Sequence, residues 1–119
     1  MADFPTKERK MAQEAFAKVS ERHDKLNESD FREYKSFALS FPTLVHSCGL
    51  VQAVAFAYAK KKDKYIDDLE AVFKAVDSKG DLKTRSREAG IMEYMRISRH
   101  ALSAASWIKR YCQTFGGSD

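Results

Sequence analysis

The stretch Cys48-Gly-Leu-Val-Gln-Ala-Val-Ala-Phe-Ala-Tyr-Ala59 decides the fold, because Gln52 is its only strongly polar residue. Its apolar residues fall on every side of a helical wheel, and a helix with that pattern is normally buried. Its four alanines favour a helix over a strand, and the segment is shorter than the roughly 20 apolar residues that cross a bilayer. We therefore expect a helix over residues 49–61 in the middle of the core, with Gly49 at positive φ where a preceding helix ends.

The composition fits helices that wrap this segment. The chain has 119 residues, 44% of them hydrophobic, with only two prolines and five glycines for turns. Length and composition predict one all-α domain over residues 1–119, a bundle of about five helices with a long C-terminal helix. No signal peptide is recognisable, and Cys48 and Cys112 have neither metal-ligand spacing nor a disulfide framework. We expect free thiols on core-facing sides, a reducing cytoplasmic location and no membrane partner.

Two helices are expected before the core helix. Thr6 can cap the first, over residues 7–22. Its apolar stripe consists of Ala12, Ala15, Phe16 and Val19. Ser29 or Asp30 can cap the second. Its apolar spacing continues beyond Pro42, so we expect the helix to kink there and run on.

Two further helices are expected after the core helix. The first covers residues 63–76 by its apolar spacing. Three carboxylates should lie on its outer side, without the spacing of a metal site: Asp67, Asp68 and Glu70. The last helix should run over residues 86–115 and bury Ala53 and Phe56 of the core helix against its apolar side.

The positive charge is concentrated in the last third of the chain. Residues 1–78 are balanced, whereas residues 79–110 hold eight basic and three acidic side chains. On the polar side of the last helix, a row steps by three and four residues: Arg96, Arg99, Ser103, Ser106 and Arg110. This row spans about 21 Å, and Trp107 lies at its solvent-facing edge. Phosphates suit such a row of cations, hydroxyls and an aromatic ring, although an ordinary solvated face has the same pattern.

Catalysis finds little support in the sequence. There is no nucleophile elbow, no phosphate-binding glycine loop and no histidine pair on one helix face. His46 has no partner at metal or catalytic spacing, so a structural or surface role is expected. We predict no enzymatic activity, no metal and no cofactor.

Three stretches together resemble one protein family. Phe41-Pro-Thr-Leu-Val-His-Ser-Cys-Gly-Leu-Val-Gln-Ala-Val-Ala-Phe56 is similar to its Pro-x-Leu…Gly-Leu signature. Glu93-Tyr-Met-Arg-Ile-Ser-Arg-His-Ala-Leu-Ser-Ala-Ala-Ser-Trp-Ile-Lys-Arg-Tyr111 resembles its C-terminal signature, and Ala12-Gln-Glu-Ala-Phe-Ala-Lys-Val19 matches its first helix more loosely. The family is the small helical subunit of the Cmr complex, the type III-B CRISPR RNA-targeting effector. His100 and Ser106 depart from it, since they stand where acidic residues are expected.

The resemblance implies a non-catalytic subunit in antiviral defence. Copies of such a subunit stack along the complex, beside the backbone and large subunits, and add a basic surface to the groove that holds guide RNA and target RNA. Cations hold the target strand by its phosphates, while pairing to the guide supplies sequence choice. The predicted backbone contacts are Arg85, Arg87, Arg96, Arg99, Lys109 and Arg110, with Trp107 as an interface residue. The alternatives are a helical adaptor that binds only protein, or a small enzyme whose site is not evident.

Overall fold

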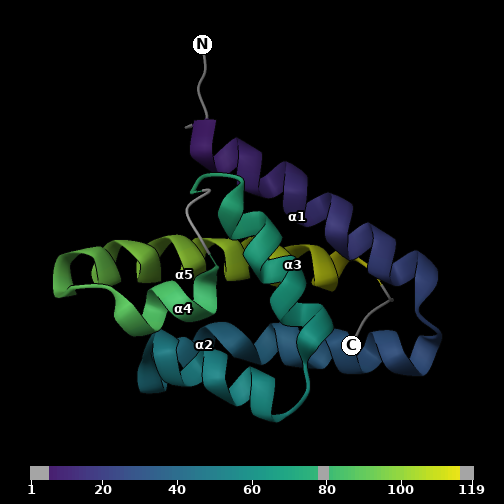
Figure 1. The fold of residues 1–119 in the computed structure, drawn as a ribbon. Helices are drawn as coiled ribbons and strands as arrows, with labels where there is room; N and C mark the ends of the chain where they lie inside the picture. The colour runs from purple at the N-terminus through teal and green to yellow at the C-terminus, as the bar shows by residue number, and fades with distance from the viewer. Residues whose placement is uncertain (1–5, 78–80, 116–119) are drawn as a thin grey trace.

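Five α-helices make up the described part of the chain, residues 6–77 and 81–115, in which there is no strand (Figure 1). The computed structural model orders them as α1 (Thr6–Lys25), α2 (Glu28–Ala59), α3 (Asp63–Lys74), α4 (Leu82–Glu88) and α5 (Ile91–Thr114). The all-α class, the five helices and the long C-terminal helix predicted from the sequence are confirmed.

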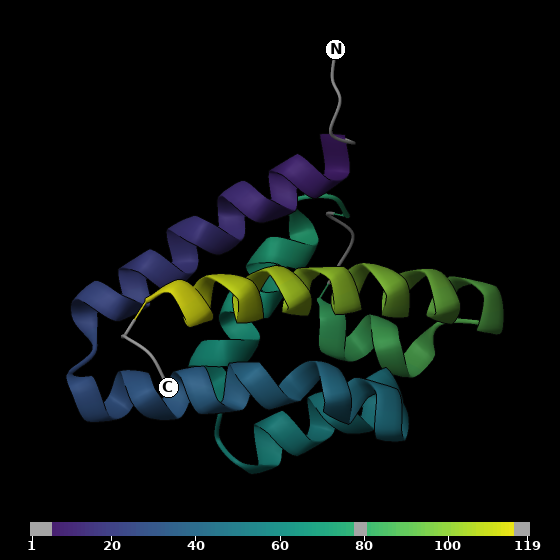
Figure 2. The same cartoon turned by 180° about the vertical axis from the view of Figure 1, so that it is seen from behind.

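Helix α5 occupies the centre of the packing. It runs between α1 and α2, and α3 crosses it (Figure 2). Its fully buried side consists of Ile97, Ala101, Ala104, Ala105, Ile108 and Cys112. The small alanine side chains let neighbouring helices approach closely. The predicted apolar side of this helix is therefore confirmed as part of the core from Ile97 onward, whereas Ile91, which its spacing also placed on that side, is 78% exposed.

Helix α2 is bent into an elbow at Gly49. The helix runs on through Pro42, as predicted, but the residue with non-helical backbone angles inside it is Gly49, at φ 87° and ψ 162°, and not Pro42, where the kink was expected. Beyond the elbow, the Val51 N–H donates a hydrogen bond to the Tyr94 hydroxyl of α5 at 3.2 Å. The positive φ expected at this glycine is confirmed, and the elbow folds the second part of α2 back along the molecule (Figure 2).

The prediction that Phe56 is buried against the C-terminal helix is wrong. Its side chain is 43% exposed, and its ring stacks on Phe37 with centroids 6.5 Å apart. The buried residues beyond the elbow are Leu50, Ala53, Val54 and Ala57. These positions share one face of the helix. The segment thus lies at the edge of the core, with its other apolar face open, because no further helix covers it in the described part.

By length and composition, α2 is also apolar enough to cross a membrane. Core helices of folded domains meet the same criterion, so this is weak evidence. Here the helix buries aromatic residues such as Phe31 and Phe41 in the common core and contacts α3, α4 and α5. The elbow at Gly49 also interrupts the straight helix that a span requires.

Several predicted helix ends are corrected by the structure. Thr6 is the first residue of α1 rather than its cap. Asn27, and not Ser29 or Asp30, caps α2, because its Oδ1 accepts the Asp30 N–H at 2.7 Å. The last helix is also not continuous over residues 86–115: α4 ends at Glu88, and α5 begins after its N-cap, Gly90.

Asp68 is buried, contrary to the expectation that it lies on the outer side of its helix. Its carboxylate accepts hydrogen bonds from Arg22 Nε at 2.9 Å and from the Tyr34 hydroxyl at 2.6 Å. It therefore ties α1, α2 and α3 together. Glu70 is also engaged, since it accepts the Leu82 N–H at the start of α4 at 2.6 Å. Two of the three predicted surface carboxylates are structural contacts.

The two cysteines are free, as predicted. Cys112 is buried, and this burial raises the pKa of its thiol to about 12. Cys48 is half-buried and its thiol donates to the Leu44 carbonyl at 3.2 Å. A buried thiol with so high a pKa stays protonated and behaves as a small apolar side chain.

Candidate nucleic-acid interface

The outer face of α5 brings part of the predicted row together with Trp107. These side chains line one open hollow of about 520 Å³ beside α1: Glu8, Arg99, Leu102, Ser103, Ser106, Trp107 and Arg110. Their α5 members recur at intervals of three and four residues, so they share one stripe of the helix. The structure thus places two arginines, two hydroxyls and an indole around the same space.

Arg99 and Arg110 are the exposed cations of this hollow. Neither has an ion pair within the described residues. Lys109 follows on the flank of the helix and is half-buried. Unpaired guanidinium groups at the rim of a hollow are available to fork onto an anion such as phosphate.

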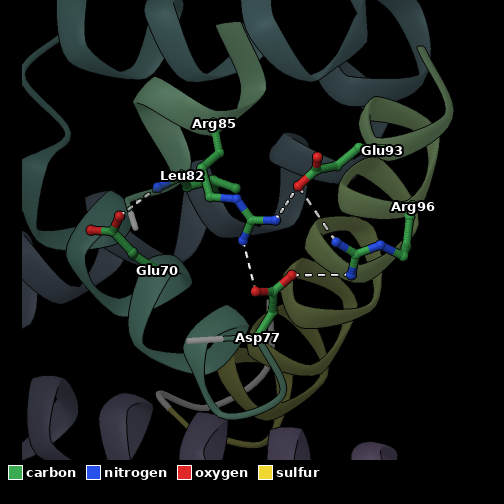
Figure 3. Close-up of polar contacts among 6 residues, drawn as sticks. All are labelled: Glu70, Asp77, Leu82, Arg85, Glu93 and Arg96. Atoms are coloured by element: carbon green, nitrogen blue, oxygen red, sulfur yellow. Dashed lines mark hydrogen bonds and ion pairs between the residues drawn. The ribbon is translucent and has the colours of Figure 1, made fainter. Parts of the chain in front are cut away.

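Arg85 and Arg96 are used differently, because both are held by carboxylates within the chain (Figure 3). Buried Asp77 accepts from Arg85 Nη1 at 2.7 Å and from Arg96 Nη1 at 3.1 Å. Glu93 binds the same two side chains, at 2.6 Å and 3.6 Å. The Arg85 side chain is only 11% exposed, whereas that of Arg96 is 40% exposed. This cluster joins the segment that follows α3 to α4 and α5.

Arg87 lies on α4, outside the hollow. Its side chain is exposed and pairs with the neighbouring Glu88 at 3.5 Å. An ion pair between two exposed groups contributes little to stability. Of the six basic residues predicted to contact RNA, the structure therefore brings Arg99 and Arg110 to one hollow, with Lys109 next to them.

Trp107 is half-buried. The sequence had suggested that this side chain faces solvent. Its indole N–H donates to Glu8 Oε1 of α1 at 2.7 Å. Its ring stacks on Tyr111, with centroids 5.9 Å apart and an interplanar angle of 23°. Both contacts hold the indole in place between α1 and α5.

A second hollow, of about 360 Å³, opens on the other side of the Trp107 indole. It is lined by Glu8, Arg9, Ala12, Gln13, Phe16, Trp107 and Tyr111. The Phe16 ring is 50% exposed and meets the Tyr111 ring edge-on at 5.5 Å. The sequence placed Phe16 in the core stripe of the first helix, but Met11, Ala15 and Val19 fill that stripe. Nothing in the sequence indicated Glu8, and Tyr111 stood out only as the aromatic residue that ends the C-terminal signature.

His46 and His100 lie in different surroundings. His46 is exposed, and His100 lies near the Phe73 ring, with centroids 6.5 Å apart. Burial lowers the pKa of His100, and nearby Lys7 adds to this effect. In the ranges 6–77 and 81–115, no three histidine, cysteine or acidic side chains gather as they would around a metal ion.

The chain is similar to CRISPR-associated proteins over most of its length. The family model described as "CRISPR-associated protein (Cas_Cmr5)" matches residues 7–115. The "CRISPR system Cmr subunit Cmr5" of Thermus thermophilus is 35% identical over 111 residues, which cover 91% of this chain and 94% of that protein. The crystal structure of a CRISPR-associated Cmr5 family protein from Thermus thermophilus matches with a TM-score of 0.80 and 34% identity, over 92% of this chain and 97% of that chain. The chain therefore belongs to the Cmr5 family of CRISPR-associated proteins.

Proposed function

We propose that this protein is a non-catalytic structural subunit of a type III-B CRISPR ribonucleoprotein in antiviral defence. Family membership supports this role, and the Thermus relative carries the name of a Cmr subunit. Its partners are the backbone and large Cmr subunits, neighbouring copies of itself, and the guide and target RNA. It acts in the cytoplasm. Sequence choice comes from base pairing, so this subunit needs only contacts that accept any sequence.

The RNA contact runs through Arg99 and Arg110, with Lys109 beside them. The observation that carries this proposal is the pair of exposed guanidinium groups at one hollow, without carboxylate partners in the described part of the chain. Each can bind a phosphate through two N–H groups and reads no base. Arg85 and Arg96 contribute mainly to the fold, because Asp77 and Glu93 already hold them. Arg87 adds positive charge at a distance.

The double variant Arg99→Glu, Arg110→Glu tests this contact. Binding of labelled single-stranded RNA should weaken for all sequences alike, and the dependence of log affinity on log salt should flatten. Loss of two phosphate contacts to a single strand changes that slope by about 1.4. The measurement is a titration of the complex at several salt concentrations, alongside co-purification with the other subunits.

The matched control is Lys64→Glu, Lys74→Glu, which changes the net charge equally on exposed positions of α3, away from the hollow. If both double variants weaken RNA binding equally, only overall charge matters and the assigned contacts are wrong. Full assembly with unchanged RNA affinity in the α5 variant would also exclude them.

A helical adaptor without RNA contact is the second candidate. It is favoured by the apolar residues at the start of α5, where Ile91 is 78% and Met92 is 79% exposed and Met95 lies next to them. Adjacent exposed apolar side chains of this kind mark protein contacts. Under this alternative, a complex that contains the Arg99→Glu, Arg110→Glu variant assembles normally and binds RNA as tightly as the unchanged complex. Only substitutions at the apolar start of α5 disturb assembly.

A further inference from the structure

The hydrogen bond between Trp107 and Glu8 divides the space between α1 and α5 into two hollows of different chemistry. Both residues line both hollows. On one side lie Arg99 and Arg110 with two serine hydroxyls. On the other lies an aromatic and apolar surface built mainly from Phe16 and Tyr111, which Arg9 also lines. A cationic hollow and an aromatic hollow therefore share one wall.

The aromatic hollow is held open by rings that brace one another. Tyr111 stacks on Trp107 and meets the edge of Phe16. Phe16 also lies against Phe115, with centroids 5.9 Å apart. These contacts fix the ring positions, yet half of the Phe16 side chain remains exposed. A flat ligand can enter without first ordering the side chains that receive it.

Charge and shape together identify the occupant. An apolar peptide would fill the aromatic hollow and leave two neighbouring arginines without an anion. A single-stranded nucleic acid carries flat bases and phosphates side by side, and proteins bind it with aromatic rings beside a cationic groove. We propose that an unpaired RNA base enters the hollow at Phe16 and stacks on its aromatic rings, while adjacent phosphates bind Arg99 and Arg110. This inference rests on the proposed function and deepens it.

Glu8 and Gln13 add polar groups to this arrangement. Among the described residues, the Glu8 carboxylate is the only acidic group that lines either hollow, and it accepts the Trp107 N–H. Because Glu8 lines both hollows, its charge does not distinguish them, and the phosphates are placed by Arg99 and Arg110. The Gln13 amide lines the aromatic hollow and offers a donor and an acceptor to a base edge. Stacking accepts every base, which fits a subunit that leaves sequence choice to the guide.

Trp107 makes the test specific, because it is the single tryptophan of the chain. The full chain is titrated with oligouridylate and, separately, with an abasic strand of equal length, while indole fluorescence and binding anisotropy are recorded. Oligouridylate should quench the fluorescence and bind more tightly. The abasic strand should bind through its phosphates without that quenching.

The variant Phe16→Ala should weaken oligouridylate binding about tenfold and leave abasic-strand binding unchanged, since a stacked base loses roughly that much on alanine substitution. Met92→Ala is the control, an exposed apolar truncation outside both hollows. Arg99→Glu, Arg110→Glu should weaken both strands equally. A thermal melt confirms that each variant is folded.

The outcomes separate this inference from the proposed function. If both strands bind alike and neither quenches Trp107, the RNA contact stands and the base site is excluded. If neither strand binds, both ideas fail. If Phe16→Ala keeps its RNA affinity but no longer joins the complex, the hollow receives protein, and the inference is overturned.

Discussion

The buried Asp77 carboxylate binds two arginine side chains and so contributes to the stability of the fold. It binds Arg85 and Arg96, which come from different helices (Figure 3). Asp77→Ala should lower the free energy of unfolding by about 3 kcal/mol, because it removes the buried anion of the nearly buried Arg85 and leaves only the more exposed Glu93. Arg96→Gln should cost only about 1 kcal/mol, because that side chain is more exposed and Arg85 still holds the carboxylate. Urea unfolding of both variants measures the difference, and equal losses would contradict the assigned roles.

The sequence could not distinguish Arg96 from Arg99. Both lie on the predicted polar face of one helix, three residues apart, and periodicity treats them alike. Which of them meets an anion depends on Asp77, which is 19 residues before Arg96. The charge excess and the face were predictable, whereas the pairing of individual cations depends on tertiary structure.

Two glycines divide the helices, and they respond in opposite ways to a side chain. Gly49 has φ 87°, and an added Cβ would lie 3.3 Å from the Tyr94 hydroxyl. Gly49→Ala should therefore destabilise the protein by about 1–2 kcal/mol. Gly90 has φ −68°, open space around it and no side-chain cap for α5. Gly90→Ser should stabilise the protein by about 0.3 kcal/mol.

Thermal melts of the two glycine variants should show a lower melting temperature for Gly49→Ala and a slightly higher one for Gly90→Ser. A tolerated Gly49→Ala would mean that the elbow is not required. Loss of stability in Gly90→Ser would mean that the start of α5 is held by something other than its first turn.

At the scale of elements, apolar spacing predicted most helices and their buried sides. It missed the separation of α4 from α5, because a single glycine inside a helical pattern does not by itself mark a helix end. It also missed Asn27 as a cap, since several cap residues stand close together there. Such boundaries depend on which local hydrogen bonds form, and a single sequence leaves several possible.

The whole molecule presents two contrasting surfaces, the α1–α5 hollows and the apolar start of α5. Met92→Lys should reduce co-purification with other subunits and leave RNA affinity of the isolated chain unchanged, because the charge falls on an apolar patch outside the hollows. Met92→Leu is the control that keeps the patch apolar. Normal assembly of the lysine variant would exclude this patch as a contact.

The fold and family could be predicted from the sequence because helical spacing and three ordered stretches extend over most of the chain. The two hollows between α1 and α5 could not be predicted from the sequence. Trp107 and Glu8 are 99 residues apart, and only the packing of α1 on α5 joins them. The exposure of Phe56 likewise depends on the absence of a covering helix in the described part, which an apolar pattern cannot reveal.

The hydrogen bond at the elbow of α2 makes one amide sensitive to the separation of α5 from α2. The Val51 amide lies just beyond Gly49, in the first turn of the resumed helix, where amides lack an acceptor in their own helix. Its acceptor is the Tyr94 hydroxyl of α5. Deuterium uptake at this amide should therefore follow the departure of α5 from the elbow. In Tyr94→Phe, exchange should accelerate at Val51 while amides in the middle of α1 keep their rates; a uniform acceleration would show that the two helices separate only when the whole protein unfolds.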